Sequence, residues 1–271
     1  MSLMLHAFIL FISIFLPQSD PDQEVEIQFL ANEGFLISSG ETQILIDGAF
    51  KKEFDYLDVL AESGLNEFKN AEGKFSSLDI ILATHLHGDH FNAELIGNHL
   101  SKNTYSTFLG PNETVKNFKA NFEAFGSISN RVMSESPEPN STNEISINGT
   151  SINVIRTYHS GNAPWNLAEN NGYLINIGGR SILHLGDAKI DSSLVHQLAK
   201  TSTNVDLVIL PYWSLQTTEV LDMIYEQLKP KQILIAHIPL AYQKVAPQQV
   251  KGLGYENMVA MVKQFEIITI N

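Results

Sequence analysis

The amino-acid sequence predicts an α/β domain in which two mixed β-sheets pack on each other and helices cover their outer faces. Strand-rich hairpins are followed by a run of alternating strands and helices, and this order occurs twice along the chain. The length of 271 residues and the apolar fraction of 44% suit one large domain of this class or two small ones.

The first half of the chain begins with predicted strands. Apolar and polar residues alternate over 25–29, and the apolar segments 34–38 and 42–46 flank turn residues, which predicts a hairpin. Residues 50–75 are more polar and carry apolar residues at helical spacing. We therefore expect them to form a helical surface insertion before a buried strand at 79–82.

Turn residues and apolar periodicity define the remaining elements. Asn148-Gly149 and Gly178-Gly179 each separate two strand-like segments, which predicts two further hairpins. The other predicted elements are helices over 91–100, 110–122, 192–198 and 217–228, strands over 104–109, 205–210, 232–236 and 265–270, and a last helix before the final strand.

The heptapeptide at 84–90, THLHGDH, follows the predicted strand 79–82 directly. Imidazoles and carboxylates are costly to bury unless something pairs them, and a divalent metal ion is a common partner. His85 and His87 can point the same way from an extended segment, while Asp89 and His90 follow in the loop or first helical turn. The heptapeptide therefore predicts a metal site.

Other potential ligands also come at the ends of predicted strands. His159, Asp187 and His237 each end one, as His85 does. Side chains at strand ends are typical of α/β sites, because rigid strands position them while the loops there stay open to solvent. Histidine and aspartate suit zinc, iron or manganese, and a carboxylate can bridge two ions.

The composition excludes several classes of protein. A net charge of −13 argues against a nucleic-acid-binding surface. The absence of cysteine excludes disulfides, thiolate zinc sites and thiol nucleophiles. Arginine is restricted to Arg131, Arg156 and Arg180, so an anionic substrate would depend on metal ions and a few lysines for charge neutralisation.

Residues 1–20 have the pattern of a signal peptide. The run 3–16 is almost wholly apolar, is short for a transmembrane helix, and is followed by the polar stretch 17–20. No lysine or arginine precedes the run, so a buried N-terminal strand or helix of a cytoplasmic protein is the alternative. The pattern favours export to the periplasm or the cell exterior, with one domain over 21–271 and no membrane span after cleavage.

The ordered set of motifs resembles the metallo-β-lactamase superfamily: Asp47 after a strand, the heptapeptide, His159, Gly186-Asp187 and His237. The resemblance implies a four-layer αβ/βα sandwich, with two mixed β-sheets flanked by helices, and a site for two divalent metal ions. It also implies these roles: His85, His87 and His159 hold the first ion, Asp89, His90 and His237 hold the second, Asp187 bridges them, and Asp47 steadies the histidine loop from behind.

Within that superfamily, Gly186-Asp187 differs from true metallo-β-lactamases, which use Cys or Ser near that position. The inserted domain and basic surface of the nucleic-acid-processing branch are also absent from the sequence. Segments 158–162 and 183–187 are most similar to the ascorbate-6-phosphate-lactonase-like and phospholipase-D-like hydrolases.

The function expected from this resemblance is hydrolysis of a small-molecule ester, lactone, amide or phosphodiester. A hydroxide between two metal ions, Zn²⁺ first and Mn²⁺ or Fe as options, would attack the substrate, with Asp89 orienting the nucleophile and accepting its proton. The alternatives are an iron-dependent redox member of the same fold and a non-catalytic metal-containing binding protein. The oligomeric state stays open.

Several further residues are candidates for a place near the site. His184 lies inside a predicted strand, where a hydrogen-bonded structural histidine is favoured over a proton shuttle. Lys189 follows Asp187 closely, but a solvated lysine is favoured over one that faces an anionic group. The remaining candidates for substrate contact are Asn162, Trp165 and Tyr212.

Overall fold

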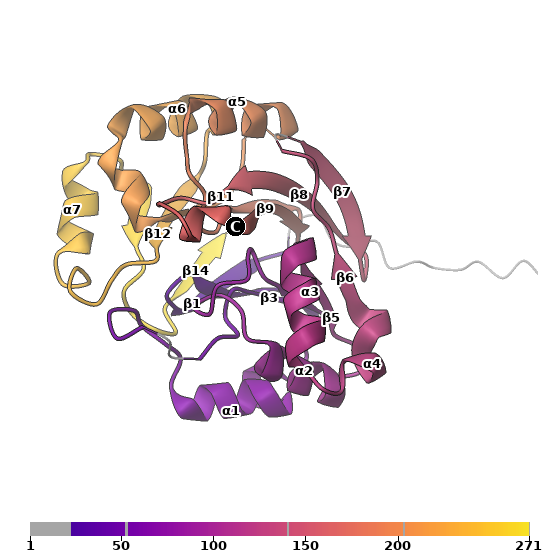
Figure 1. The fold of residues 1–271 in the computed structure, drawn as a ribbon. Coiled ribbons are helices and arrows are strands. Elements are labelled where there is room, and N and C mark those ends of the chain that lie inside the picture. The colour runs from indigo at the N-terminus through magenta and orange to yellow at the C-terminus, as the bar shows by residue number, and fades with distance from the viewer. Residues whose placement is uncertain (1–22, 52–53, 140, 203, 271) are drawn as a thin grey trace, which may run out of the picture.

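The computed structural model describes residues 23–51, 54–139, 141–202 and 204–270. Two seven-stranded sheets pack face to face with helices on both outer sides, which confirms the predicted sandwich (Figure 1). The strand order is β14-β1-β2-β3-β4-β5-β6 in the first sheet and β13-β12-β11-β10-β9-β8-β7 in the second. The predicted signal peptide at 1–20 lies outside the described residues.

The first half of the chain supplies most of the first sheet and the helices that cover it. Its elements are β1 (Val25–Ala31), β2 (Gly34–Ser39), β3 (Thr42–Ile46), α1 (Glu62–Asn70), η1 (Gly73–Phe75), β4 (Ile80–Leu82), α2 (Ala93–Lys102), β5 (Thr107–Gly110), α3 (Asn112–Asn121), α4 (Phe125–Ile128), η2 (Ser129–Arg131) and β6 (Val132–Ser134).

The second half supplies the second sheet and returns its last strand to the first. Its elements are β7 (Thr142–Ile147), β8 (Thr150–Tyr158), η3 (Trp165–Leu167), β9 (Glu169–Ile177), β10 (Arg180–His184), α5 (Ser192–Thr201), β11 (Leu207–Pro211), η4 (Tyr212–Gln216), α6 (Thr218–Leu228), β12 (Gln232–Ala236), α7 (Ala246–Gly252), β13 (Met258–Ala260) and β14 (Ile267–Ile270).

The three predicted hairpins are confirmed as β2–β3, β7–β8 and β9–β10. Among the described residues of the predicted insertion at 50–75, helix forms over α1 and η1 and the rest is turn or irregular. Strands β6 and β13, of three residues each, were not predicted.

Apolar side chains fill the space between the sheets. Phe29, Phe35, Ile44, Ile182 and Leu234 belong to this central cluster, and none of them is more than 1% exposed. Full burial of such a side chain stabilises the fold by about 1.5–3 kcal/mol. Two further clusters lie outside the sheets, one beneath α1 and α2 and the other beneath α5 and α6. Among the described residues, no helix has the length and apolar character needed to cross a bilayer.

The two halves of the molecule meet at one rim, beyond the carboxyl ends of β3, β4, β10 and β12. The backbone N–H of Asn171 donates to the carbonyl of Thr84 (2.9 Å), and that of His237 donates to the carbonyl of Asn32 (2.8 Å). These bonds hold the heptapeptide and the end of β12 against the opposite half. The sequence-predicted ligands lie at this rim.

Candidate metal centre

The seven predicted ligands come together in two groups. Ligand atoms of His85, His87, His159 and Asp187 all lie within 4.8 Å of one another, and the same holds for Asp89, His90 and His237. Below, His85, His87 and His159 are called the first ligand set, and Asp89, His90 and His237 the second ligand set. The first half of the chain supplies four of the seven residues and the second half three.

The heptapeptide leaves β4 as a turn, and the helix begins only after it. The backbone N–H groups of His90 and Phe91 both donate to the carbonyl of His87 (3.0 Å each). Helix α2 starts at Ala93, where Asn92 accepts the N–H of Leu95 with its side chain (3.0 Å). Asp89 and His90 therefore lie in the loop that precedes the helix, which lets neighbouring residues face different ligand sets.

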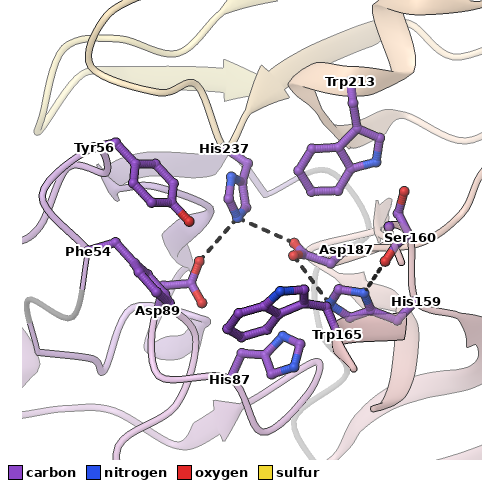
Figure 2. A pocket seen from close by; sticks show the side chains of 11 residues that line it. Phe54, Tyr56, His87, Asp89, His159, Ser160, Trp165, Asp187, Trp213 and His237 are labelled. Carbon is purple, nitrogen blue, oxygen red and sulfur yellow. Dashed lines mark hydrogen bonds and ion pairs between the residues drawn. The ribbon is translucent and has the colours of Figure 1, made fainter. Parts of the chain in front are cut away.

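The carboxylate of Asp187 lies between the two sets. Its Oδ2 is 3.9 Å from Nε2 of His85 and 3.4 Å from Nε2 of His159. Its Oδ1 is 3.2 Å from Nε2 of His90 and 3.6 Å from Nε2 of His237. Figure 2 shows Asp187 between His159 and His237. One oxygen faces each set.

The imidazole nitrogens at this point have no hydrogen-bond partner. Nε2 of His85, His90, His159 and His237 and Oδ1 of Asp187 are all buried and unpaired. Leaving one buried polar atom unpaired costs about 1–3 kcal/mol, so five at one place need an explanation. Their lone pairs converge as ligands do around a cation, and the donor set therefore fits bound metal ions.

Asp47 holds the heptapeptide from behind. Its Oδ1 accepts the backbone N–H of Thr84 (2.8 Å), and its Oδ2 accepts the Thr84 hydroxyl (2.6 Å) and Nδ1–H of His90 (2.9 Å). Because the hydroxyl donates to Asp47, Nδ1–H of His85 donates to that hydroxyl (3.0 Å). These bonds leave Nε2 of both histidines as the free acceptor, as a metal ligand requires.

Two of the residues at the rim have a strained backbone. Asp47 has φ of 47° and His237 has φ of 54°, in the left-handed region that non-glycine residues rarely occupy. Both follow the last residue of a strand, β3 and β12 respectively. The turn at each strand end brings the side chain back toward the other half of the molecule.

His159 is fixed by its own loop. Its Nδ1–H donates to the carbonyl of Ser160 (2.6 Å; Figure 2), so its Nε2 is also left as an acceptor. Backbone bonds between 158–160 and 187–189 join its strand end to that of Asp187. His159 and Asp187 therefore form one unit.

Electrostatics differ between the two sets. Burial lowers the pKa of His85 well below its ordinary value and that of His87 to about 4, with the other histidines adding to the effect. Burial acts the same way on His90, but the carboxylates of Asp187, Asp89 and Asp47 together outweigh it and raise the pKa of His90 well above its ordinary value. Without a bound ion, His85 and His87 are therefore neutral, whereas His90 holds a proton.

Asp187 and Asp89 remain ionised because neighbouring histidines outweigh the effect of burial on their pKa values. Burial alone would raise their pKa values, but His237 and His90 outweigh it and hold the pKa of Asp187 well below its usual range. His90 and the nearby His237 do the same for the pKa of Asp89. Both carboxylates are therefore available to a cation.

Sequence patterns did not reveal two residues beneath the site, Asn32 and Glu33. The Asn32 amide donates to the backbone carbonyl and to Oδ2 of Asp89 (3.3 and 3.4 Å). Glu33 is fully buried, and burial together with the charge of Asp187 raises its pKa well above the ordinary value. Both lie in the turn between β1 and β2, where polar residues ordinarily indicate a surface turn.

His184 has the hydrogen bonds of a structural residue. Its Nδ1 accepts the backbone N–H of Gly186 (3.1 Å), so the proton is on Nε2, which donates to the carbonyl of Glu33 (2.9 Å). Gly186 itself has φ of 55°, and a Cβ there would lie 2.6 Å from the Thr84 side chain. This close approach brings Asp187 against the heptapeptide.

A cavity of about 370 Å³ opens over the ligands. Its walls include four aromatic residues, Phe54, Tyr56, Trp165 and Trp213, which surround His87, Asp89 and His237 in Figure 2. The Trp165 ring meets the His87 ring edge-on at 5.3 Å. None of the described residues that line the cavity is a lysine or an arginine.

Of the other residues that the sequence suggested, two line a cavity and two do not. Trp165 lines this cavity, and Tyr212 lines a second cavity beside it. Asn162 is exposed in the loop after His159 and does not line either cavity. Lys189 is exposed as well, and it lines neither cavity.

Comparisons with known proteins agree with this geometry. Residues 26–237 match the model of the beta-lactamase superfamily domain. A metal-dependent hydrolase of Heliobacterium modesticaldum is 25% identical over 82% of this chain and 87% of its own length.

Solved structures have the same fold. The metallo hydrolase Igni18 of Ignicoccus hospitalis superimposes with a TM-score of 0.59 at 17% identity, covering 92% of this chain and 99% of that one. CmlA, a diiron β-hydroxylase from Streptomyces venezuelae, superimposes with a TM-score of 0.56 at 15% identity, covering 92% of this chain and 54% of that one. With the family match over most of the chain, the sandwich and its motifs, the protein belongs to the metallo-β-lactamase-fold superfamily.

Proposed function

We propose that this protein is a metal-dependent hydrolase with a two-metal centre. The observation that carries the proposal is the position of Asp187, whose two carboxylate oxygens face two different groups of unpaired imidazole nitrogens. The similarity to proteins described as metal-dependent hydrolases supports the reaction class.

The ligand sets divide the donors between two ions. His85, His87 and His159 hold one ion, Asp89, His90 and His237 hold the other, and Asp187 serves both. Imidazole nitrogen and carboxylate oxygen are ligands that Zn²⁺ accepts readily, and Mn²⁺ and iron accept them as well. Zn²⁺ is our first choice because neutral imidazoles predominate in the first set.

Bound divalent ions lower the pKa of a coordinated water toward neutrality and polarise the oxygen of the bond that is cleaved. Asp89 is the residue placed to orient the attacking water and take its proton. Its Oδ2 is 3.2 Å from Nε2 of His237 and accepts the Asn32 amide at 3.4 Å, so its direction is fixed. Four aromatic side chains line the cavity above these groups.

The reaction that fits this site is hydrolysis of an ester, lactone, amide or phosphodiester bond in a small molecule. A second candidate is an iron-dependent oxidation, which the structural similarity to a diiron β-hydroxylase favours because the same donor types hold iron. If the predicted signal peptide functions as such, the enzyme works outside the cytoplasm.

Metal loading and a substrate panel test the proposal. The protein is stripped with a chelator, reloaded with Zn²⁺, Mn²⁺ or Fe²⁺, and assayed by plasma mass spectrometry, visible absorbance and hydrolysis of nitrophenyl esters, a lactone, a nitrophenyl phosphodiester and a chromogenic β-lactam. We expect two ions per chain and metal-dependent hydrolysis in at least one class. Activity with iron only, with an absorbance band of a diiron centre, would favour the oxidation instead. Metal binding with no reaction in any arm would favour a binding protein.

A further inference from the structure

A second cavity adjoins the metal centre. It has a volume of about 870 Å³, and Tyr56, Trp213 and His237 line both cavities. The far wall is formed by η4, by the loop after β12 and by α7. A molecule whose reacting group lies over Asp187 can therefore extend past Trp213 into the second cavity.

The walls of the second cavity are uncharged. They carry aromatic and aliphatic side chains such as Leu57, Leu215 and Leu253, and none of the described lining residues is Asp, Glu, Lys or Arg. The ring of Tyr242 lies 5.7 Å from that of Tyr212, whose hydroxyl donates to Gln249. An ion in this space would lose its hydration without gaining a charged partner, so the cavity suits an uncharged occupant with apolar groups to set against the leucines.

The first cavity adds a charge argument. Apart from metal ions at the centre itself, its described walls offer no fixed cation to an anionic group, since none of the lining residues is a lysine or an arginine. The chain as a whole has a net charge of −13, so long-range attraction of anions is also lacking. A substrate without a negative charge suits both cavities better than a phosphodiester.

We infer that the two cavities form one substrate channel for an uncharged carbonyl ester with an elongated apolar acyl chain, which occupies the second cavity. The inference rests on the proposed hydrolase function and narrows its substrate class. In the reaction, the oxygen of one water joins the acyl carbon, the acyl C–O bond breaks, and a proton passes to the departing alcohol. The products are a carboxylic acid and an alcohol.

A chain-length series tests the channel through activity. We expect kcat/KM for nitrophenyl esters to rise from acetate to butyrate to octanoate, by as much as about fourfold for each methylene that leaves water. A nitrophenyl phosphodiester should react more slowly than the octanoate. Ester hydrolysis without any dependence on chain length, or a preference for the anionic substrate, would overturn the channel while leaving the hydrolase proposal intact.

A binding measurement tests the channel without activity. The protein has two tryptophans, Trp165 and Trp213, and both line the first cavity. The uncharged fluorophore N-phenyl-1-naphthylamine should accept energy from them when it occupies the channel, and octanoate ester should compete with it. If the probe does not bind, the channel proposal fails whatever the outcome of the ester assays.

Charge substitutions locate the acyl chain. Tyr242→Asp places a carboxylate on the second cavity, and Gln216→Glu does so with almost no change in shape; both side chains are exposed, so folding should tolerate them. Each should lower the octanoate-to-acetate ratio of kcat/KM about tenfold and weaken probe binding. Leu240→Asp is the matched control, because Leu240 has similar exposure (44%, against 49% for Tyr242) and lines neither cavity.

The pattern across these variants decides the outcome. An unchanged ratio in both channel variants, or an equal loss in Leu240→Asp, would contradict the assignment of the second cavity to the substrate. Loss of probe binding as the protein concentration rises would show that a second copy of the chain covers the cavity, and this would also overturn the proposal.

Discussion

The first and second ligand sets share Asp187 but differ in what lies behind them. The first set is supported by neutral oxygens, the Thr84 hydroxyl behind His85 and the Ser160 carbonyl behind His159. The second set contains the carboxylate of Asp89, and a second carboxylate, that of Asp47, lies behind His90. Two cation sites that share one carboxylate can thus differ in charge.

This difference has a chemical consequence. Neutral histidines favour a cation through nitrogen coordination, whereas the carboxylates of the second set add Coulomb attraction and make its histidine ligand more basic. In the metal-free protein the same carboxylates keep a proton on His90, which an incoming ion must displace. The metal affinity of the second set therefore depends on residues that are not ligands themselves, and the affinity of the first set depends on such residues much less.

The largest effect is expected from removal of the residue that the sets share. Asp187→Ala should lose both ions and lower turnover by at least about 10³-fold, more than the 10–100-fold typical of groups behind the ligands. Metal content, turnover and circular dichroism measure this, with His196→Gln on the exposed face of α5 as a control that keeps both ions. One ion retained at full affinity would show that the sets are independent.

A glycine substitution should disturb both sets equally. Gly186→Ala places a methyl group against Thr84 at a φ of 55° and should cost about 2–4 kcal/mol of unfolding free energy, while weakening both ions. Gly149→Ala is the matched control: its φ is 85° and nothing lies within 4 Å, so only the backbone cost of about 1–2 kcal/mol remains. Equal costs in denaturant titrations would refute the close approach of the two halves.

Removal of the Asp47 charge behind His90 should affect the metal affinity of the second set much more than that of the first. Asp47→Asn should weaken the second ion about 10–100-fold and change the first by less than about threefold. Competition with a metal-chelating dye measures both affinities. Asp79→Asn provides the control, since Asp79 accepts the Gln43 N–H before β4 begins, away from the ligands. A larger effect on the first ion would show that the charge of Asp47 supports the first set instead.

The smallest expected effect concerns pH in the chelator-treated protein. The pKa of His87 is lowered to about 4, so the unfolded chain binds more protons than the folded protein between about pH 6.5 and 4. Stability should fall as the pH drops through that window, by an amount of order 1 kcal/mol after allowance for solvent screening.

The contribution of His90 to stability has the opposite pH dependence, because its pKa is raised in the folded protein. Its protonation stabilises the fold fully below about pH 6.5, and this stabilisation is lost as the pH rises through the pKa of the folded state. Urea titrations across this range give the free energy of unfolding as a function of pH. That curve should be flatter on its acid side for His87→Gln and flatter on its alkaline side for His90→Gln. The same change of slope in both variants would refute the electrostatic difference between the sets.

The sequence predicted the sandwich, and it singled out seven polar residues that the fold brings together at one rim, for a physical reason. Strand ends such as those before His85 and His237 must expose their next residue at the rim, and polar residues there are visible in a single sequence. Asn32 and Glu33 were missed because a polar pair in a tight turn is also what an ordinary surface loop contains. Their burial arises from packing against Asp89 and Asp187, which are distant in sequence.

The second cavity was beyond the reach of sequence patterns for a similar reason. Tyr56 and Tyr242 lie far apart in the chain, and a backbone hydrogen bond from the Leu240 N–H to the Tyr56 carbonyl (2.9 Å) joins their loops. Tyr212 was a candidate because it follows a strand, yet its place is in this second cavity. Aromatic residues in loops carry no periodic signal that shows which space they enclose.

The division of the proposed ligands between the two halves of the chain would give bound ions a mechanical role. Four of these residues follow β4 and three follow strands of the second sheet, so an ion in either proposed site would cross-link the sheets at their rim. The free energy of unfolding then rises with the concentration of free metal, by about 2.7 kcal/mol for each site at one hundred times its dissociation constant. Metal scarcity would thus lower the resistance of the protein to unfolding and proteolysis at the same time as its activity.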